Sequence, residues 1–506
     1  MKGALMRAAG HGAIAALAGF LLNMGSAHAA DLGGNCCADL EERIAELEAT
    51  TVRKGNRRVS LSVSGQVNRS LLYWNDGFQN DLYSVDNAIS NSRFRFTGNA
   101  KLSADLTAGF YMEFSMALGA RSHQVSQVDD DGFSGSGGIL GGAIFGDGIG
   151  GAGDSVLDFN QANWYIDSKH WGRVTVGRLN TATAGIGTID LSNTGVIANS
   201  QPFLWGGGMF TRNGLGQFGL SWGNLCGGPS AATSVLPVTI LNPGAGAYAT
   251  DCGIHALSRH DAVRYDTPTW HGFTFSGAFG EDDFWDVAAR YAGEHHGFRV
   301  AAGVGYRWYD DREPDFATPL TPATAPKSGQ LDDTHRRHWL SSASVMHIAT
   351  GLFVSGTWNQ YQFHGSNALE IFDLDPSRNR PDVNLWWVDA GIQRNWTGWG
   401  NTTFYAEYGH VDDGVTGLVV SGTSAAGALT GLGGQGVVVD SDMSWWGLGA
   451  VQTIDAAAMD LYLGFRWYSA DATFGDSAIT TAQPTKQIPG GIEDIWYIQA
   501  GARIQF

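Results

Sequence analysis

Few charged or nucleophilic side chains in this sequence fall into the spacing of a catalytic site. Glu294-His295-His296 lacks the second histidine at helical spacing that a zinc-dependent protease requires, and it falls in a predicted turn. The glycine-rich stretch 132–153 lacks the Gly-Lys-Ser/Thr ending of a phosphate-binding loop. No set of serine, histidine and acid can be assembled on neighbouring predicted strands. The sequence therefore predicts neither an enzyme nor a cofactor.

Two weaker patterns could bind a metal ion. The acidic run 129–131 could hold Ca²⁺ against anionic lipid headgroups, although runs of charge are usually just solvated. Three histidines could contact a metal, but exposed polar residues in a loop and a strand explain them as well: His335, His338 and His347. We therefore predict no metal site.

A second set of charged residues recurs at every other position of apolar segments. Arg299 and Arg307, for example, alternate with Val300, Ala302 and Val304. This period of two places the charges on one face of β-strands. The basic members are Arg93, Arg95, Arg264, Arg290, Arg299, Arg307, Arg466 and Arg503. The acidic members are Glu113, Asp286, Asp389, Glu407 and Asp460. This face is net basic although the chain carries −18, because most of the acid lies between the predicted strands.

The composition indicates which sheet presents these faces. The 506 residues include 71 Gly, 18 Trp, 15 Tyr and 25 Phe, with 16% charged residues and a mean hydropathy of −0.12. After the first 30 residues the sequence has no run of ~20 apolar residues, which a membrane-spanning helix requires. A soluble β-sandwich would show the same alternation, but Trp and Tyr cluster near strand ends, as in the interfacial girdles of membrane β-barrels. The negative charge argues against nucleic acid as a partner.

Short and long connections alternate along the predicted strands. Tight turns are predicted at 103–105, 168–170, 212–215, 269–271, 294–296, 349–351, 397–399 and 456–458. Asn213-Gly214 is the most specific of them, since this dipeptide favours the type I′ hairpin turn. The count predicts an antiparallel transmembrane β-barrel of 18 strands, with 16 as the alternative and the weakest strands at 203–211 and 261–267. Both termini then lie at the short-turn end, as in bacterial outer-membrane barrels.

The N-terminal residues have a different character. Residues 1–29 combine Lys2 and Arg7, a short apolar stretch and Ala27-His28-Ala29, which is typical of a secretory signal peptide. Residues 30–58 are predicted to form a short periplasmic helix followed by a basic linker, and residues 59–506 the barrel. The helix either rests on the protein surface or joins the helices of neighbouring subunits in a small bundle.

The four cysteines suggest one disulfide. Cys226 and Cys252 lie in one stretch rich in Gly, Pro and Ala and could pair in the oxidising periplasm. Cys36 and Cys37 are adjacent and would be strained if they paired with each other. Neither pair has the spacing of a zinc site.

The last strand and the mature N-terminus resemble a known family. Residues 494–506 alternate apolar and polar side chains and end on Phe506, as the C-terminal assembly signal of outer-membrane barrels does. This strand, the stretch from Asp31 to Asn68 and the junction 177–180 are similar to the porins of alphaproteobacteria. The resemblance implies a homotrimeric outer-membrane porin that allows passive diffusion of small hydrophilic solutes and ions. It also implies contact with outer-membrane lipid and lipopolysaccharide, and recognition of the C-terminal strand by the barrel-assembly machinery.

By the same resemblance, a loop at about 180–202 folds into the barrel and narrows it. Arg178 and Asp190 would then lie at the constriction, with the acid facing the arginines of the wall. Alternatively, Arg178 and Asp190 are ordinary charges of the rim. Two further functions stay open: a barrel selective for sugars or organic anions, and, as a weaker reading, an outer-membrane enzyme or adhesin.

Overall fold

A computed structural model describes thirteen stretches of the chain: residues 59–116, 121–123, 125–127, 157–216, 218–226, 259–280, 283–310, 335–364, 381–416, 419–421, 435–476, 486–487 and 491–506. All belong to one of the two units into which the chain divides, Arg58–Phe506. The predicted signal peptide, N-terminal helix and basic linker lie outside the described residues. So do Cys36, Cys37, Cys252 and the acidic run 129–131.

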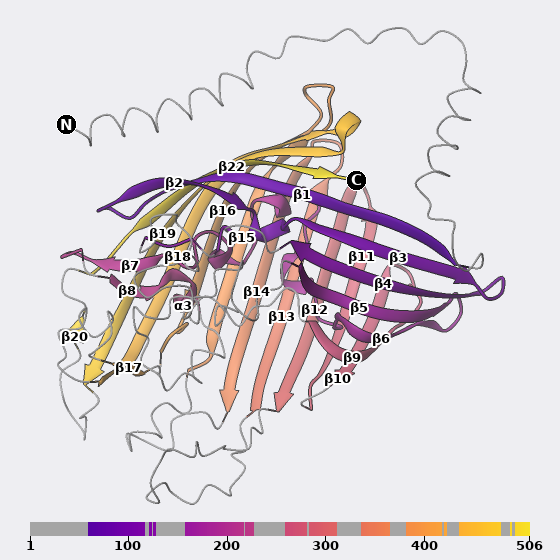
Figure 1. The fold of residues 1–506 in the computed structure, drawn as a ribbon, viewed down its shortest axis with the longest axis horizontal. Coiled ribbons are helices and arrows are strands. Elements are labelled where there is room, and N and C mark those ends of the chain that lie inside the picture. The colour runs from indigo at the N-terminus through magenta and orange to yellow at the C-terminus, as the bar shows by residue number, and fades with distance from the viewer. Residues whose placement is uncertain are drawn as a thin grey trace, which may run out of the picture. The chain divides into compact units, whose positions relative to one another are not determined.

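The alternating segments form one closed antiparallel sheet, as predicted (Figure 1). The first strand, β1 (Ser60–Asn75), pairs with the last, β22 (Ile495–Gln505), and Leu71 lies opposite Ala500. This pairing closes the barrel, so that neither β1 nor β22 has an unpaired edge. In Figure 1 the two strands lie side by side, β1 in indigo and β22 in yellow.

Sixteen strands form the wall, which confirms the alternative count and shows that the prediction of eighteen was wrong. Between β1 and β22 the wall contains β3 (Arg93–Lys101), β4 (Leu106–Met116), β5 (Leu157–Ser168), β6 (Gly172–Asn180), β9 (Arg259–Asp266), β10 (Phe273–Gly280), β11 (Trp285–His295), β12 (Phe298–Asp310), β13 (His335–His347), β14 (Leu352–His364), β15 (Val383–Arg394), β16 (Thr402–Asp412), β18 (Gln435–Ile454) and β19 (Met459–Asp476). Three short strands join the same sheet: β2 (Asn80–Asp86), β17 (Val419–Ser421) and β20 (Lys486–Gln487).

The two surplus predicted strands flank the Asn213-Gly214 turn. That turn joins β7 (Phe210–Asn213) to β8 (Phe218–Ser221), which form a separate three-stranded sheet with β21 (Ile492–Glu493). Residues 201–213 are all buried. A wall strand must instead expose every second side chain to lipid, so this hairpin cannot belong to the wall.

The other seven predicted turns join neighbouring wall strands at one end of the barrel, here called the short-turn end. Two are tight hairpins whose central residues both have positive φ: His271 (48°) with Gly272 (87°), and His296 (50°) with Gly297 (83°). Positive φ at both positions is the requirement of a type I′ turn, which matches the twist of the flanking strands. The opposite end is called the long-connection end.

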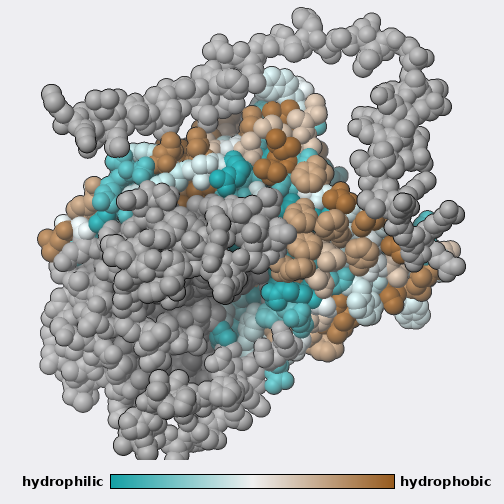
Figure 2. Space-filling model, in the orientation of Figure 1, coloured by the Kyte–Doolittle hydropathy of each residue, from teal (hydrophilic) through white to brown (hydrophobic). Residues whose placement is uncertain are grey.

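The two faces of the wall differ as the alternation predicted. Outward side chains are apolar and exposed, and part of this surface is brown in Figure 2. Examples are Val63, Val67, Phe275, Val287, Val304, Val354, Leu448, Leu463 and Ile504. Inward side chains include buried polar and charged groups such as Asn68, Asp286, Arg307, Asp389 and Arg466. Among the described residues, no helix combines the length and the apolar character needed to cross a membrane.

Candidate functional site

Residues 181–226, here called the internal segment, connect β6 towards β9 and fold inside the barrel. The segment contains η2 (Ile186–Thr188), η3 (Thr194–Val196), η4 (Pro202–Leu204), the β7–β8 hairpin and α3 (Trp222–Leu225). Most of its described residues are buried, unlike those of a loop that runs over a protein surface. Its hydrogen bonds reach inward-facing residues from β9 to β22. The sequence predicted a constriction loop at about 180–202. The internal segment includes this range and continues to residue 226.

The start of the segment is attached to the carboxylate of Asp286 on β11. This carboxylate accepts hydrogen bonds from Thr181 Oγ1 (2.6 Å) and from the backbone N–H groups of Ala182 (3.0 Å) and Thr183 (2.7 Å). Arg307 of β12 donates to Thr183 Oγ1 from Nε (3.0 Å) and Nη2 (2.6 Å). Asp286 and Arg307 are 0% and 1% exposed, so these bonds lie in a low-dielectric site where losing a partner is costly.

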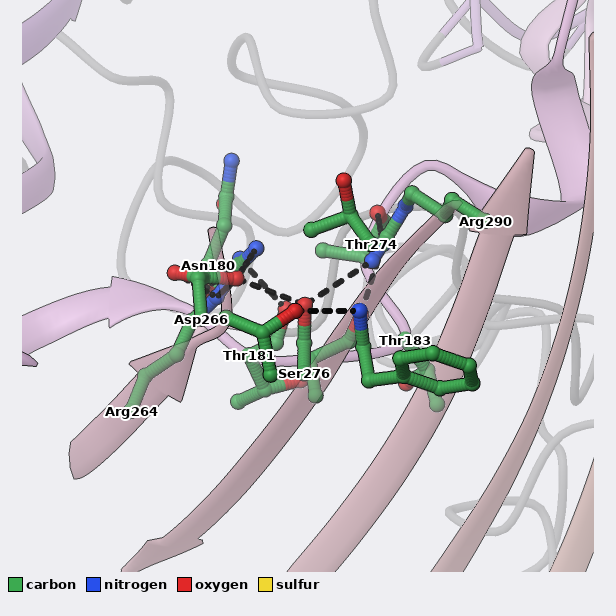
Figure 3. Close-up of polar contacts among 12 residues, drawn as sticks. Asn180, Thr181, Thr183, Arg264, Asp266, Thr274, Ser276 and Arg290 are labelled. Carbon is green, nitrogen blue, oxygen red and sulfur yellow. Dashed lines mark hydrogen bonds and ion pairs between the residues drawn. The ribbon is translucent and has the colours of Figure 1, made fainter. Parts of the chain in front are cut away.

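Two further arginines bind backbone carbonyls of the same stretch (Figure 3). Arg264 on β9 donates from Nη1 to the carbonyls of Asn180 and Thr181, both at 2.9 Å, and pairs with Asp266 at 2.7 Å. Arg290 on β11 donates from Nη2 to the carbonyls of Ala182 (2.6 Å) and Ala184 (2.8 Å). Both side chains are only part-buried. They therefore hold the segment and also present positive charge beside it.

The middle of the segment is held by carboxylates of β15 and β19. Thr194 Oγ1 donates to Asp389 (2.7 Å), and Asn193 Nδ2 donates to Asp460 (2.9 Å). Arg503 of β22 pairs with the same Asp460 at 2.7 Å. Asp389 is fully buried. The wall carboxylates that alternate with apolar residues thus serve largely as attachment points.

The third attachment uses a fully buried ion pair. Arg466 on β19 binds Glu407 on β16, donates from Nη2 to the carbonyl of Asn199 (2.9 Å), and lies over the ring of Trp205 at 5.1 Å. Tyr468 donates its hydroxyl hydrogen to the carbonyl of Pro202 at 2.8 Å. One guanidinium therefore connects two wall strands and the internal segment.

Glycines on the inward face of the wall make room for the segment. A Cβ at Gly305 would lie 2.7 Å from Thr183 Cγ2, and one at Gly303 would lie 2.9 Å from Ile189 Cδ1. A Cβ at Gly464 would lie 2.8 Å from the Trp205 ring. These distances are shorter than any real Cβ contact, so a larger residue would displace the segment.

Apolar side chains fill the space between the segment and one part of the wall. Ile197, Leu204 and Trp205 of the segment belong to one buried cluster with inward residues of β1, β15, β16, β18, β19 and β22: Leu72, Trp74, Leu385, Tyr405, Trp445, Tyr462, Ile495 and Tyr497. Close-packed apolar groups leave no path for water or ions. This side of the barrel is therefore closed.

Polar side chains with partial exposure lie on β3 and β4, which follow β1 along the wall. Arg93 and Arg95 on β3 meet Glu113 on β4, with Nη1–Oε1 at 3.7 Å and Nε–Oε2 at 2.6 Å. The two arginine side chains are 14% and 32% exposed, whereas Glu113 is buried. Tyr111 donates its hydroxyl hydrogen to Glu113 at 2.8 Å. The structure thus brings together three of the predicted pore-lining residues on this wall.

Other predicted residues lie elsewhere. Arg178 shares the outward register of Val174 on β6; it is 45% exposed, and its Nη1 lies 4.0 Å from Asp261 Oδ2. Asp190 accepts hydrogen bonds from Ser192 and Gly195, so its carboxylate closes a turn within the segment. Neither side chain contacts an inward arginine in the described part of the chain, so the pairing of Asp190 with the arginine wall is not seen.

The remaining predicted residues lie apart from these charged groups. Arg299 lies at the short-turn end, where it pairs with Glu294 at 2.8 Å and is half exposed. Cys226 is buried and disulfide-bonded, but its predicted partner Cys252 lies outside the described residues. Phe506 follows β22 directly and is exposed. Among the described residues, no group of three or more His, Cys, Asp or Glu could hold a metal ion.

One attachment was not foreseen from the sequence. Arg212 of the β7–β8 hairpin donates from Nε to Asp76 (2.9 Å), from Nη2 to Gln79 (2.9 Å) and from Nη1 to the carbonyl of Gly216 (2.8 Å). The pair with Asp76 is almost completely buried. A lone arginine beside Asn213-Gly214 gave no signal for a partner 136 residues away.

A closed antiparallel barrel with an inserted segment across its interior defines a membrane channel of the porin class. A family model described as Gram-negative porin matches residues 13–473, and the chain belongs to this family. It is accordingly a multi-pass protein of the outer membrane that forms a diffusion channel rather than an enzyme. No curated protein matches the sequence at a significant level.

Similar solved structures include two proteins from other bacteria. The anion-selective porin of Comamonas acidovorans is 16% identical, with a TM-score of 0.47, and the match covers 88% of this chain and 100% of that one. OprB of Pseudomonas putida is 10% identical, with a TM-score of 0.48, and the match covers 92% of this chain and 97% of that one.

Proposed function

We propose that this porin is a general-diffusion channel for small hydrophilic solutes and ions, and that its open path lies between the internal segment and the wall from β3 to β11. The part-exposed guanidinium of Arg95, on the wall next to the apolar cluster, carries this proposal. Further charged groups of the path are Arg93, Glu113, Arg264, Asp266 and Arg290. A polar lining excludes lipophilic solutes, since they would give up apolar contacts for a hydrated charged surface.

The net charge of this path is positive. Four arginines face it, and Glu113 and Asp266 are the carboxylates paired with them. Arg307 and Arg466, which were predicted to line the pore, are 1% and 0% exposed beneath the internal segment. We therefore assign them a positioning role and expect weak anion preference to depend on the part-exposed arginines.

The assembly of the channel is part of the same proposal. We propose that the chain is of the alphaproteobacterial type, is exported by its signal peptide and forms a homotrimer in outer-membrane lipid and lipopolysaccharide. The resemblance of its N-terminus and its C-terminal strand to those porins supports this. The C-terminal strand would be recognised by the barrel-assembly machinery through Phe506.

Recording in planar lipid bilayers tests the channel directly. The purified full chain should produce ohmic conductance steps at low voltage, in groups of three if trimers insert. A folded preparation that inserts but conducts no current would contradict every channel function. A sugar or an organic anion that blocks the current at micromolar concentration would instead favour a solute-selective barrel.

A further inference from the structure

The outward face of β10 to β13 contains an apolar groove of about 380 Å³. Small residues create it. Ala289 of β11 lies directly between Phe275 of β10 and Val304 of β12, and Gly277 adds no side chain opposite Val287. Phe275, Val287 and Val304 are each about half exposed, so the groove opens towards the hydrocarbon of the membrane. The outward side chains that line it are Phe275, Val287, Ala289, Val304, Tyr306 and Trp339.

A basic and aromatic group lies beyond the groove, on the side of the long-connection end. Arg337 of β13 shares the outward register of Trp339, and its guanidinium carbon lies 5.1 Å from the ring centroid of Trp308. Trp308 stacks in turn on Trp285, with 13° between the rings. These three residues lie opposite one another on β13, β12 and β11.

The height of this group relative to the groove matches the dimensions of a lipid. Arg337 precedes Trp339 by two residues, and the residues paired across the other end of the groove lie two further along the strands. At a rise of about 3.3 Å per residue, the guanidinium is attached roughly 7–13 Å beyond the groove. Tryptophan favours the boundary between lipid and water. Arg337 therefore lies at the level of lipid headgroups, and the groove lies at the level of acyl chains.

The outward face of β16, β18 and β19 has the opposite charge at its long-connection end. Asp412 of β16 lies opposite Asp442 of β18, which lies opposite Asp471 of β19. All three follow the outward register of the exposed aromatic residues Tyr408 and Trp446 on these strands. Neighbouring carboxylates repel an anionic headgroup. A negatively charged lipid should therefore prefer the surface at Arg337.

We propose that the groove and Arg337 form a binding site for one molecule of lipopolysaccharide. An acyl chain of its lipid A occupies the groove, and a lipid A phosphate accepts hydrogen bonds from Arg337. A guanidinium carries five N–H donors in a planar fork, so it can bind a phosphate in addition to its present contacts. The long connections of such barrels are extracellular, which places the site in the outer leaflet, where lipopolysaccharide lies. The site rests on the proposed contact with lipopolysaccharide but not on conductance.

The aromatic contact gives Arg337 a second role in this site. Its guanidinium rests on Trp308, and a cation over an indole face is attracted by the ring. The position of the guanidinium is thus fixed before the lipid binds, which lowers the entropy lost on binding. The groove is apolar and the charged group is at one end, a combination that fits an amphipathic ligand and not a free phosphate ion.

Native mass spectrometry of the full chain tests the site. The folded protein is purified in a mild detergent, and lipopolysaccharide truncated to lipid A and its inner-core sugars is added in EDTA. The chelator removes divalent cations that would otherwise bridge lipid phosphates to Asp412, Asp442 and Asp471. We expect one tightly bound lipopolysaccharide per wild-type chain. Binding of lipid A without phosphate groups should be several-fold weaker.

Two variants and a matched control locate the binding. Arg337→Gln removes the charge and Ala289→Phe fills the groove, and each should weaken binding several-fold. Ala390→Phe on β15 is the control, because Ala390 is also an exposed outward alanine but lies outside the groove. It should bind as the wild type does. The heat-dependent mobility of each variant on gels verifies its fold, and conductance should be unchanged in all three because the substitutions lie on the outward face.

Three results would overturn the site. Wild-type affinity in both Arg337→Gln and Ala289→Phe would show that lipopolysaccharide binds elsewhere. Equal weakening in Ala289→Phe and Ala390→Phe, or equal affinity for lipid A with and without phosphate, would show unspecific contact of the wall with lipid. In these cases the proposed contact with lipopolysaccharide still stands. If the folded wild type binds no lipopolysaccharide at all, that contact is refuted together with the site.

Discussion

Arg466 and Glu407 form a two-point ion pair, with Nε–Oε1 at 2.5 Å and Nη2–Oε2 at 2.8 Å, and both side chains are 0% exposed. Trp387 also donates to the carboxylate from Nε1 (2.8 Å), and Arg466 reaches the carbonyl of Asn199. The pair therefore determines where the internal segment lies as well as how β16, β18 and β19 pack.

Removing the arginine alone should destabilise the protein. In Arg466→Leu the Glu407 carboxylate stays buried without its counter-charge, and such a loss costs about 3–5 kcal/mol. The free energy of unfolding, measured by urea titration in detergent micelles, should fall by this amount. Conductance should become noisier, because Asn199 loses its anchor.

The double variant Arg466→Leu/Glu407→Leu is the control. It removes both charges, so most of the stability should return, while the noise of the single-channel current should persist. Equal stability of the single and the double variant would show that the ion pair is not the source of the cost.

The inward glycines provide a second test of the attachment. Gly305→Val places a side chain where Thr183 and Ile186 lie, and overpacking of this kind costs about 1–3 kcal/mol. We expect lower stability and altered conductance. Gly277→Val is the matched control, since its Cβ would point outward and meets only ordinary contacts at 3.9 Å. Equal effects at the two positions would mean that the segment does not press against the wall at Gly305.

The ion preference of the channel can be assigned to particular arginines. Replacing Arg93 and Arg95 with Gln should lower the ratio of anion to cation permeability by roughly twofold or more, because fixed charges along a narrow path govern selectivity. The reversal potential in a KCl gradient reports this ratio. Arg178→Gln removes a charge from the outward face and should leave the ratio unchanged. A shift in the Arg178 variant as large as in the double variant would refute the proposed path.

How much of this site could be read from the sequence depends on the range of each interaction. The alternation of Val300, Ala302 and Val304 with Arg299 and Arg307 correctly predicted the two faces of β12, because the period of two is local. The same alternation could not show that Arg307 is covered by Thr183 and Arg299 is not. That difference depends on contacts 124 residues apart along the chain. A turn was correctly predicted at Asn213-Gly214, but its type was wrong: the N–H of Gly216 bonds to the carbonyl of Asn213, and only Gly216 has the positive φ that a type I′ turn requires at both central residues. Its position inside the barrel depends on distant partners.

A part-buried histidine predicts a pH dependence outside the wall. His123 packs its ring against Phe203, with the centroids 6.4 Å apart, and its backbone carbonyl accepts a hydrogen bond from Gly208. Burial, with a smaller contribution from the charge of Arg121, lowers the pKa of His123 to about 3, from its ordinary value of 6.5. Below pH 6.5 the unpacked state therefore binds a proton that the packed state does not. As the pH falls from 6.5 to 3, the free energy that favours the packed state of His123 should decrease by about 1.4 kcal/mol for each pH unit.

Hydrogen exchange of two amides measures the weakening. The N–H groups of Gly206 and Gly208 donate to the carbonyls of Ser122 and His123, so their protection should fall as the pH decreases through this range, after correction for intrinsic exchange. In His123→Gln the protection should not depend on pH. The same pH dependence in both proteins would exclude His123 as its origin.

The C-terminal residue closes the barrel and is available for recognition. Phe506 exchanges backbone hydrogen bonds with Gly65, N to O at 3.0 Å and O to N at 2.8 Å, while its side chain is 65% exposed. Because the ladder needs only the backbone, Phe506→Ala should refold in detergent with nearly unchanged stability. In cells we expect a several-fold lower yield of outer-membrane protein, since the aromatic ring would be missing from the assembly signal. Ile504→Ala, on the same outward face, should keep the wild-type yield. Equal yields for both variants, or a refolding defect in Phe506→Ala, would show that the ring acts in the barrel itself and not in assembly.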